Sequence, residues 1–238
     1  MLGAFGVVSG LEGWYVPSRN GAAVISSPGR SGTQKQARML IRHGYGVLLF
    51  DRRGEGASEG DPNGFGWGGD RDLEAAIDFL RDRPDVDPER IGGIGRSVGG
   101  ELLLETAAET DELKAVVSDG AGIRSVREAA LGDGAAKLGG VAIWSAMTAS
   151  TAVFANEPPP PNLEDLVGRI APRPVFLIYA GKGQGGEELS AEYGDAAGEP
   201  KTVWEIPEAS HVGGIDARPV EYERRVVGFF DAALLGDG

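Results

Sequence analysis

The chain has 238 residues, of which 41% are hydrophobic, and it contains no cysteine. One substantial core can be built from such a chain, so we expect a single domain over residues 1–238, held by packing without disulfides or thiolate metal sites. The formal net charge of −13 repels phosphate backbones and anionic lipid surfaces, which argues against nucleic-acid and membrane partners.

The first quarter of the chain alternates strands and helices. Residues 13–16 predict an antiparallel edge strand, and residues 22–26 predict a short apolar strand. Residues 34–43 then predict a helix that ends at Gly44, and residues 45–50 predict a strand buried on both faces. A strand, a helix and a strand in this order indicate a parallel sheet.

The same alternation continues to the C-terminal end. Further strands are predicted at residues 91–94, 115–118, 175–180 and 202–206, and helices at residues 70–83, 98–108, 189–197 and 219–235. The predicted fold class is therefore α/β, a mostly parallel doubly wound sheet flanked by helices.

One long segment, residues 138–155, carries no charged side chain. Glycine, serine and threonine dilute its hydrophobicity, and it barely reaches the roughly 18 to 20 residues that a membrane-spanning helix needs. We expect a buried or half-buried helix instead, with Trp144, Met147 and Phe154 as candidate pocket-lining residues. This helix belongs to a small cap that we expect to be inserted at about residues 121–165.

The N-terminal stretch at residues 1–10 is mildly apolar. It has neither a basic flank nor a long hydrophobic region, so it is not typical of a signal peptide. We therefore expect a cytoplasmic location.

A serine stands in the sequence Gly-Arg-Ser-Val-Gly at residues 95–99, directly between a predicted strand and a predicted helix. Such a junction pinches the backbone, and glycines two residues either side of Ser97 remove side chains that would clash. The turn holds the hydroxyl out, and the N-terminus of the following helix favours negative charge beside it. The sequence predicts that Ser97 is a nucleophile. Its neighbour Arg96 could bind an anionic group, although a surface salt bridge is the simpler role.

The chain has two histidines that could serve as a general base. His43 stands in the last turn of a predicted helix, where histidines commonly satisfy carbonyl groups, so we expect a structural role. His211 follows the last predicted strand, which places it at the C-terminal edge of the sheet. We therefore assign His211 as the base. Two scattered histidines without cysteines form no ligand cluster, so we predict no metal and no cofactor.

The histidine needs a carboxylate that fixes its tautomer and stabilises the imidazolium. The glycine-rich loop at residues 181–188 follows a predicted strand and delivers Glu187 and Glu188. Glu187 is the first choice because it comes first after the glycines, and Glu188 is the second. Asp119, directly after the preceding strand, is a third candidate.

Together these features resemble the α/β-hydrolase superfamily, in particular its compact dienelactone-hydrolase-like and prolyl-oligopeptidase-like branch. The resemblance covers nearly the whole chain and rests on three features: residues 95–99, the order serine, acid, histidine that ends at His211, and residues 51–58. Residues 51–58 are similar to the Asp-x-Arg-Gly-x-Gly-x-Ser loop of the family. The resemblance implies an α/β-hydrolase fold.

The resemblance also implies an oxyanion hole. One donor would be the backbone N–H of Val98, and the second would come from the loop at residues 28–32. We favour the amide of Arg30, with Gly29 and Ser31 as alternatives. Pro28 and Glu55 stand where the family often has histidine, but the donor is a backbone amide, so the hole does not depend on that side chain.

These residues predict a serine hydrolase that cleaves small carboxylic esters through an acyl-enzyme intermediate. Trp67, in the glycine-rich stretch at residues 64–69, is expected to shape an entrance loop. A serine peptidase or aminoacyl-peptide hydrolase would use the same groups, and a non-catalytic member would keep only the scaffold. A dinucleotide-binding module is disfavoured, because its fingerprint needs a glycine where Val98 stands.

Overall fold

The computed structural model describes residues 3–4, 10–30, 32–60, 65–130, 134–155 and 158–236. Most of the N-terminal stretch at residues 1–10, Ser31 and the side chain of Phe154 lie outside the described part. The expectations that concern them therefore stay predictions.

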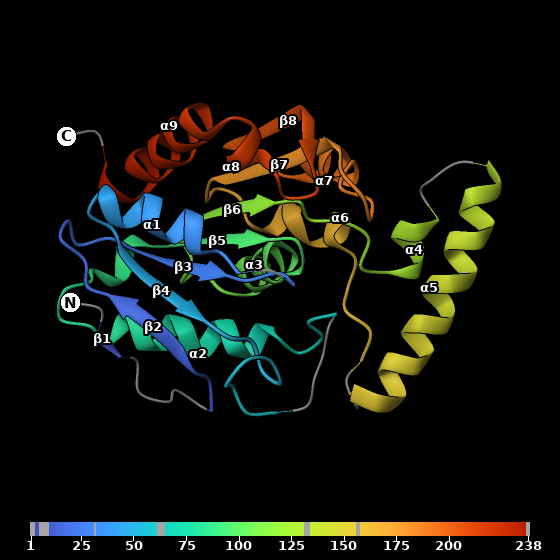
Figure 1. Cartoon of the computed structure of the whole chain (residues 1–238), viewed down its shortest axis with the longest axis horizontal. Helices are drawn as coiled ribbons and strands as arrows, with labels where there is room; N and C mark the ends of the chain where they lie inside the picture. Colours follow the sequence, from blue (N-terminus) through green and yellow to red (C-terminus); the bar gives the residue numbers. More distant parts are fainter. Residues whose placement is uncertain are drawn as a thin grey trace.

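A mostly parallel sheet forms the centre of the molecule (Figure 1). The described residues contribute eight strands, in the spatial order β1-β2-β4-β3-β5-β6-β7-β8. The six strands from β4 to β8 in this order run parallel, whereas β1 and β2 are antiparallel to their neighbours. The strands are β1 (Gly3–Ala4), β2 (Gly13–Val16), β3 (Ala23–Ser27), β4 (Gly46–Phe50), β5 (Ile91–Arg96), β6 (Ala115–Asp119), β7 (Val175–Lys182) and β8 (Lys201–Ser210).

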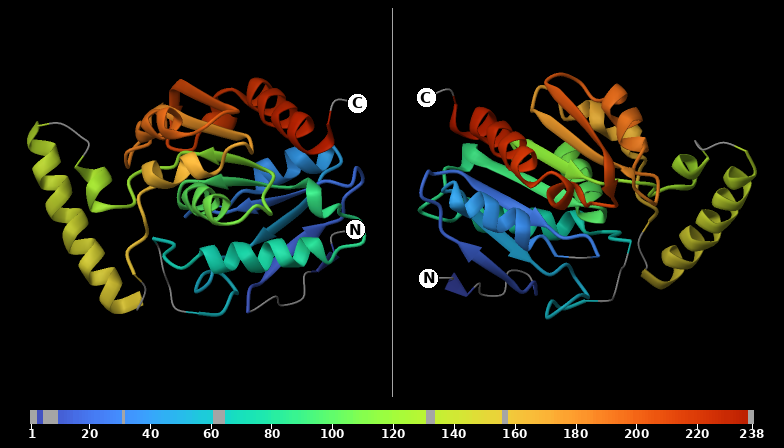
Figure 2. Two further views of the ribbon diagram at one scale, coloured as in Figure 1. Left: turned by 180° about the vertical axis from the view of Figure 1, so that it is seen from behind. Right: turned by 45° about the horizontal axis from the view of Figure 1, so that its top comes forward.

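Helices cover both faces of this sheet (Figures 1 and 2). Helices α1 and α9 pack on one face, and helices α2, α3, α6 and α7 pack on the other. The helices are α1 (Gln34–Arg42), α2 (Asp70–Arg81), α3 (Val98–Glu109), α4 (Val126–Ala129), α5 (Gly134–Ala155), α6 (Leu163–Leu166), α7 (Leu189–Ala196), α8 (Gly214–Ala217) and α9 (Pro219–Phe230), with 3-10 turns at Pro88–Arg90 and Val167–Arg169 and a π-helical turn at Asp231–Leu235. This arrangement confirms the predicted α/β class.

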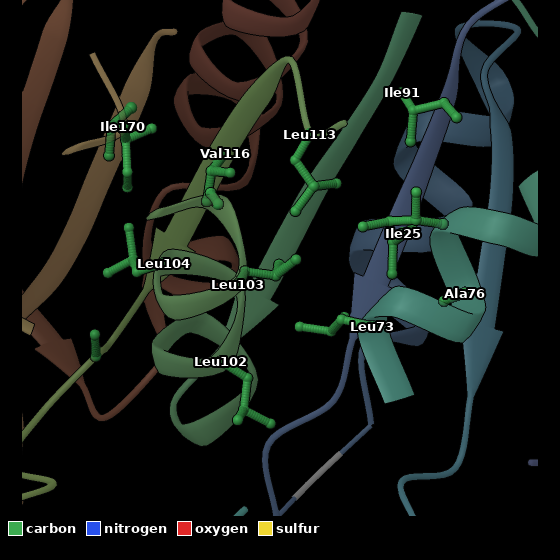
Figure 3. Close-up of a cluster of buried hydrophobic side chains, with 14 of the residues drawn as sticks. Ile25, Leu73, Ala76, Ile91, Leu102, Leu103, Leu104, Leu113, Val116 and Ile170 are labelled. Carbon is green, nitrogen blue, oxygen red and sulfur yellow. The ribbon is translucent and has the colours of Figure 1, made fainter. Parts of the chain in front are cut away.

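The parallel strands are apolar along their length because both sides of the sheet are covered. Successive side chains of a strand point to opposite faces, and β7 shows the result. Val175 and Leu177 enter the core beneath α3, whereas Phe176 and Ile178 enter the core beneath α9. Figure 3 shows part of the first core, to which α3 contributes Leu102, Leu103 and Leu104, α2 contributes Leu73, and the sheet side contributes Ile25, Leu113 and Val116.

Two strands differ from their predictions. The strand at residues 13–16 is antiparallel as expected, but the short β1 pairs with its outer side, so it is not the edge. The last strand runs to Ser210 rather than to residue 206, because pairing with β7 continues past an irregularity between Ala180 and Lys182. This extension carries the chain to the position directly before His211.

The segment between β6 and β7 holds α4 and α5. Helix α5 packs chiefly against α4 and stands beside the body of the molecule, as the views in Figures 1 and 2 agree. Along its described residues the helix leaves Ile143 and Val153 exposed, at 60% and 77%. Within the described chain, no helix combines the length and apolarity that a membrane crossing needs.

Candidate active site

Ser97 sits in the turn where β5 ends and α3 begins. Its φ is +51° and its ψ is −126°, a conformation that a non-glycine residue holds only at a cost of about 1–3 kcal/mol. The surrounding packing requires glycine on both sides: a Cβ on Gly95 would lie 2.2 Å from the carbonyl oxygen of Gly99, and a Cβ on Gly99 would lie 2.4 Å from that of Ser27. The turn predicted from residues 95–99 is therefore present, with the serine at its tip.

His211 follows β8 directly and reaches the serine. Its Nε2 lies 3.1 Å from Ser97 Oγ, and its Nδ1 is in hydrogen-bond contact with Oε1 of Glu187. The other histidine, His43, lies at the end of α1 with its Nε2 2.9 Å from a carboxylate oxygen of Glu223. The structure thus brings one of the two histidines to Ser97.

Glu187 is fully buried, and backbone groups fix both of its oxygens. Oε2 accepts a hydrogen bond from the N–H of Ala180 at 2.7 Å, and Oε1 accepts one from the N–H of Val212 at 3.2 Å. The glycine-rich loop allows this approach, since a Cβ on Gly183 would lie 2.8 Å from Cδ of Glu187. Glu188, the second candidate acid, is exposed before α7.

Asp119, the third candidate acid, lies at the end of β6 beneath the serine turn. Its backbone oxygen accepts the N–H of Ser97 at 2.8 Å, and its carboxylate accepts the hydroxyl of Tyr222 at 2.8 Å. Burial raises the pKa of Asp119 to about 6, although the Tyr222 hydrogen bond and the charge of Arg96 lower it. The structure therefore uses the Asp119 carboxylate to bind α9, while Glu187 contacts the histidine.

The two expected oxyanion donors border the same space as the serine. Val98 is the first residue of α3, and Arg30 belongs to the loop after β3. Gly29 packs directly on the serine turn, because a Cβ there would lie 2.6 Å from the oxygen of Arg96 and 3.1 Å from Cβ of Ser97. Arg30 follows Gly29 directly, and both residues line the same cavity as Ser97 and Val98.

A cavity of about 460 Å³ opens over Ser97 and His211. Three side chains that the sequence suggested for the pocket, Trp67, Trp144 and Met147, line it. Trp144 of α5 meets Phe65 edge-to-face, with the ring centroids 6.1 Å apart. Aromatic and aliphatic groups from both the body and the segment between β6 and β7 therefore form part of the cavity wall.

Sequence reasoning missed two charged residues of this cavity, Glu101 and Arg124. Glu101 stands four residues after Ser97, one helical turn further along α3. This spacing places both residues on the same side of the helix and could have indicated that Glu101 lies near the serine. It accepts the N–H of Gly122 at 3.2 Å, and burial raises its pKa to about 7. The guanidinium of Arg124 pairs with Glu105. The described residues contain no group of acidic, histidine or cysteine side chains arranged to hold a metal ion.

Comparisons with known proteins agree with this architecture. Residues 20–204 match the family of X-Pro dipeptidyl-peptidases, the S15 family. The uncharacterised protein YfhR of Escherichia coli strain K12 is 27% identical, over 94% of this chain and 77% of its own length. The solved structure of the esterase Pf2001 of Pyrococcus furiosus has a TM-score of 0.73 at 25% identity and covers 94% of this chain and 88% of its own.

A second solved structure shows the same fold at lower identity. The α/β hydrolase GrgF of Penicillium has a TM-score of 0.76 at 20% identity, and the match covers 99% of both chains. The parallel sheet, the serine turn between β5 and α3, and the family match over most of the sequence lead to one assignment. The chain belongs to the X-Pro dipeptidyl-peptidase (S15) family and has the α/β-hydrolase fold of its esterase branch.

Proposed function

We propose that this protein is a serine hydrolase that cleaves carboxylic esters of small molecules through an acyl-enzyme intermediate. One observation carries the proposal: Ser97 Oγ lies 3.1 Å from His211 Nε2, while the opposite ring nitrogen contacts the buried carboxylate of Glu187. Nucleophile, base and acid are thus connected in the order that acyl transfer requires.

The reaction would begin with attack of Ser97 Oγ on the ester carbonyl as His211 Nε2 takes the hydroxyl proton. Glu187 would keep the remaining proton on Nδ1 and stabilise the imidazolium. The backbone N–H groups of Val98 and Arg30 would hold the oxyanion; losing one such donor typically costs about 2.7–4 kcal/mol of transition-state stabilisation. His211 would then protonate the leaving alcohol and activate the water that releases the acid.

We further propose that α4 and α5 form a cap over the bound substrate. The support is that Trp144 and Met147 of α5 line the cavity together with Trp67 and Val98 of the body. This apolar part of the lining suits an apolar acyl or alcohol group, whose burial contributes roughly 25 cal/mol for each Å² removed from water. The esterase assignment of the Pyrococcus relative supports the same substrate class.

The test is hydrolysis of p-nitrophenyl butyrate, combined with labelling by a fluorophosphonate probe. Wild-type protein should hydrolyse the ester and take one label on Ser97, and Ser97→Ala should do neither. His211→Gln should lose hydrolysis, while His43→Gln is the matched control and should keep it, because His43 contacts Glu223 instead. A wild-type protein that neither hydrolyses esters nor takes the label would favour a non-catalytic member of the fold.

A second candidate function, peptidase activity, has specific support from the family match over residues 20–204. The same three groups cleave amides, so substrate binding decides between the two activities. Kinetics on Ala-Pro-p-nitroanilide beside p-nitrophenyl butyrate would separate them. A kcat/KM for the anilide equal to or above that for the ester would replace the esterase proposal with the peptidase one.

A further inference from the structure

Arg96, the residue before the nucleophile, makes hydrogen bonds to two separate loops. Its Nη1 donates to the carbonyl oxygen of Gly32 at 2.7 Å, and its Nη2 donates to the carbonyl oxygen of Val212 at 3.1 Å. Gly32 belongs to the loop after β3, and Val212 follows the histidine. The anionic-group and surface-salt-bridge roles that the sequence suggested are replaced by a bridge between backbone groups.

The loop that follows His211 needs stabilising contacts because the backbone of Val212 is strained. Its φ is +47°, which is an outlier for a β-branched residue and costs about 1–3 kcal/mol. Two side chains bind the backbone of this residue: Glu187 accepts the N–H of Val212 at 3.2 Å, and Arg96 donates to the carbonyl oxygen of Val212 at 3.1 Å. Since His211 is the residue before Val212, these bonds also set where the imidazole stands.

The loop after β3 carries the proposed oxyanion donor. Gly29 packs on the serine turn, and Arg30 supplies the backbone N–H that we expect to face the substrate oxyanion. The bond from Arg96 to Gly32 fixes the same loop two residues further on. One guanidinium therefore reaches both loops, from a backbone position directly beside Ser97.

We propose that Arg96 is a positioning residue, whose guanidinium holds the oxyanion loop and the histidine turn in register with the nucleophile. The inference deepens the proposed hydrolase function and rests on it. Two carbonyl oxygens on different segments need two donors that diverge at a fixed angle. The planar guanidinium supplies them, whereas the ammonium of lysine is a point charge that cannot span both. Lysine at this position should therefore keep the charge and lose the geometry.

The experiment compares Arg96→Lys and Arg96→Ala with wild type on p-nitrophenyl butyrate. Misplacing a catalytic group by about 1 Å can cost about 10²-fold, so kcat should fall by about 100-fold in both variants, with KM within about threefold of wild type. Guanidinium chloride at millimolar concentration should restore the kcat of Arg96→Ala at least tenfold, and sodium chloride at equal ionic strength should not. Arg38→Gln, an exposed arginine of α1, is the matched control and should behave as wild type.

Three kinetic results would overturn the proposal: a kcat for Arg96→Lys within about threefold of wild type, a loss confined to KM, or a folded Arg96→Ala that guanidinium does not rescue. Loss of the cooperative thermal transition in both variants would also overturn it, because it would assign the guanidinium to fold stability. Failure of the hydrolase proposal gives a different pattern, since wild type itself would then lack ester hydrolysis and the probe label.

Discussion

Replacing Glu187 with glutamine tests the proposed acid most sharply. The carboxylate receives three donors on two oxygens: the Ala180 N–H on Oε2, and the Val212 N–H together with His211 Nδ1 on Oε1. Glutamine offers one oxygen and one NH₂ group, so either the Ala180 side or the histidine side must face a donor. The Ala180 bond is the shorter, at 2.7 Å against 3.2 Å for Val212, and we expect the amide to turn its oxygen there.

In that orientation the NH₂ group faces His211, which must accept at Nδ1 and carry its proton on Nε2. The ring can then no longer take the proton of Ser97, whose Oγ lies 3.1 Å from Nε2. We expect kcat to fall by about 10³–10⁴-fold, the scale of a wrong tautomer in a triad, which is about 4–5.5 kcal/mol. The free energy of unfolding should fall by about 1–3 kcal/mol, because the buried N–H of Val212 would face the NH₂ group and lose its acceptor.

The assay measures kcat on p-nitrophenyl butyrate and the urea unfolding midpoint for the same preparations. Glu188→Gln is the matched control: its side chain is exposed, so both quantities should equal those of wild type. If Glu187→Gln keeps more than about a tenth of the wild-type kcat, the tautomer reasoning fails. If Asp119→Asn loses activity in its place, the acid is Asp119.

Two further predictions concern neighbours of this site. Gly120 has a φ of +79°, and a Cβ there would lie 2.5 Å from Cγ1 of Val212, so Gly120→Ala should lower the unfolding free energy by about 1–3 kcal/mol and lower kcat. Gly139→Ala, where a Cβ meets nothing within 4 Å, is the control, and equal effects in both would contradict the packing argument. For Glu101, whose pKa is raised from 4.5 to about 7 by burial, the native state holds a proton that the unfolded state releases. The stability that this group contributes is present below about pH 4.5 and is lost as the pH rises through about 7. The urea unfolding midpoints at pH 5 and pH 8 should therefore differ less in Glu101→Gln than in wild type. An equal difference in the two proteins would contradict the raised pKa of Glu101.

The sequence alone was sufficient to predict the parallel sheet, the turn that holds Ser97 and the position of His211 after the last strand. Apolar runs of four to six residues separated by helical periods predict parallel strands, and glycines at positions 95 and 99 around a serine between a strand and a helix predict a tight turn. These are local signals, because burial of a strand and clashes in a tight turn are decided by residues adjacent in the chain.

The acid could be narrowed only to three residues. Glu187, Glu188 and Asp119 all follow strands, and adjacent residues of a loop differ in burial only through distant contacts. In the structure the backbone N–H groups of Ala180 and Val212 hold Glu187 beside His211, whereas Tyr222 of α9 binds the Asp119 carboxylate. Tertiary structure also pairs β1 with β2 and extends β8 to Ser210, because both depend on partner strands.

The role of Arg96 was equally invisible in the sequence. Its two carbonyl partners, Gly32 and Val212, lie 64 and 116 residues away along the chain. Every residue has a backbone carbonyl, so the residue types at these positions do not indicate that they accept hydrogen bonds. Glu101 had a weak signal in its helical spacing from Ser97, yet its raised pKa comes from burial beneath the segment that joins β6 to α4. The sequence determined which elements form and where the serine turn stands, and only long-range packing decided which charged groups surround that turn.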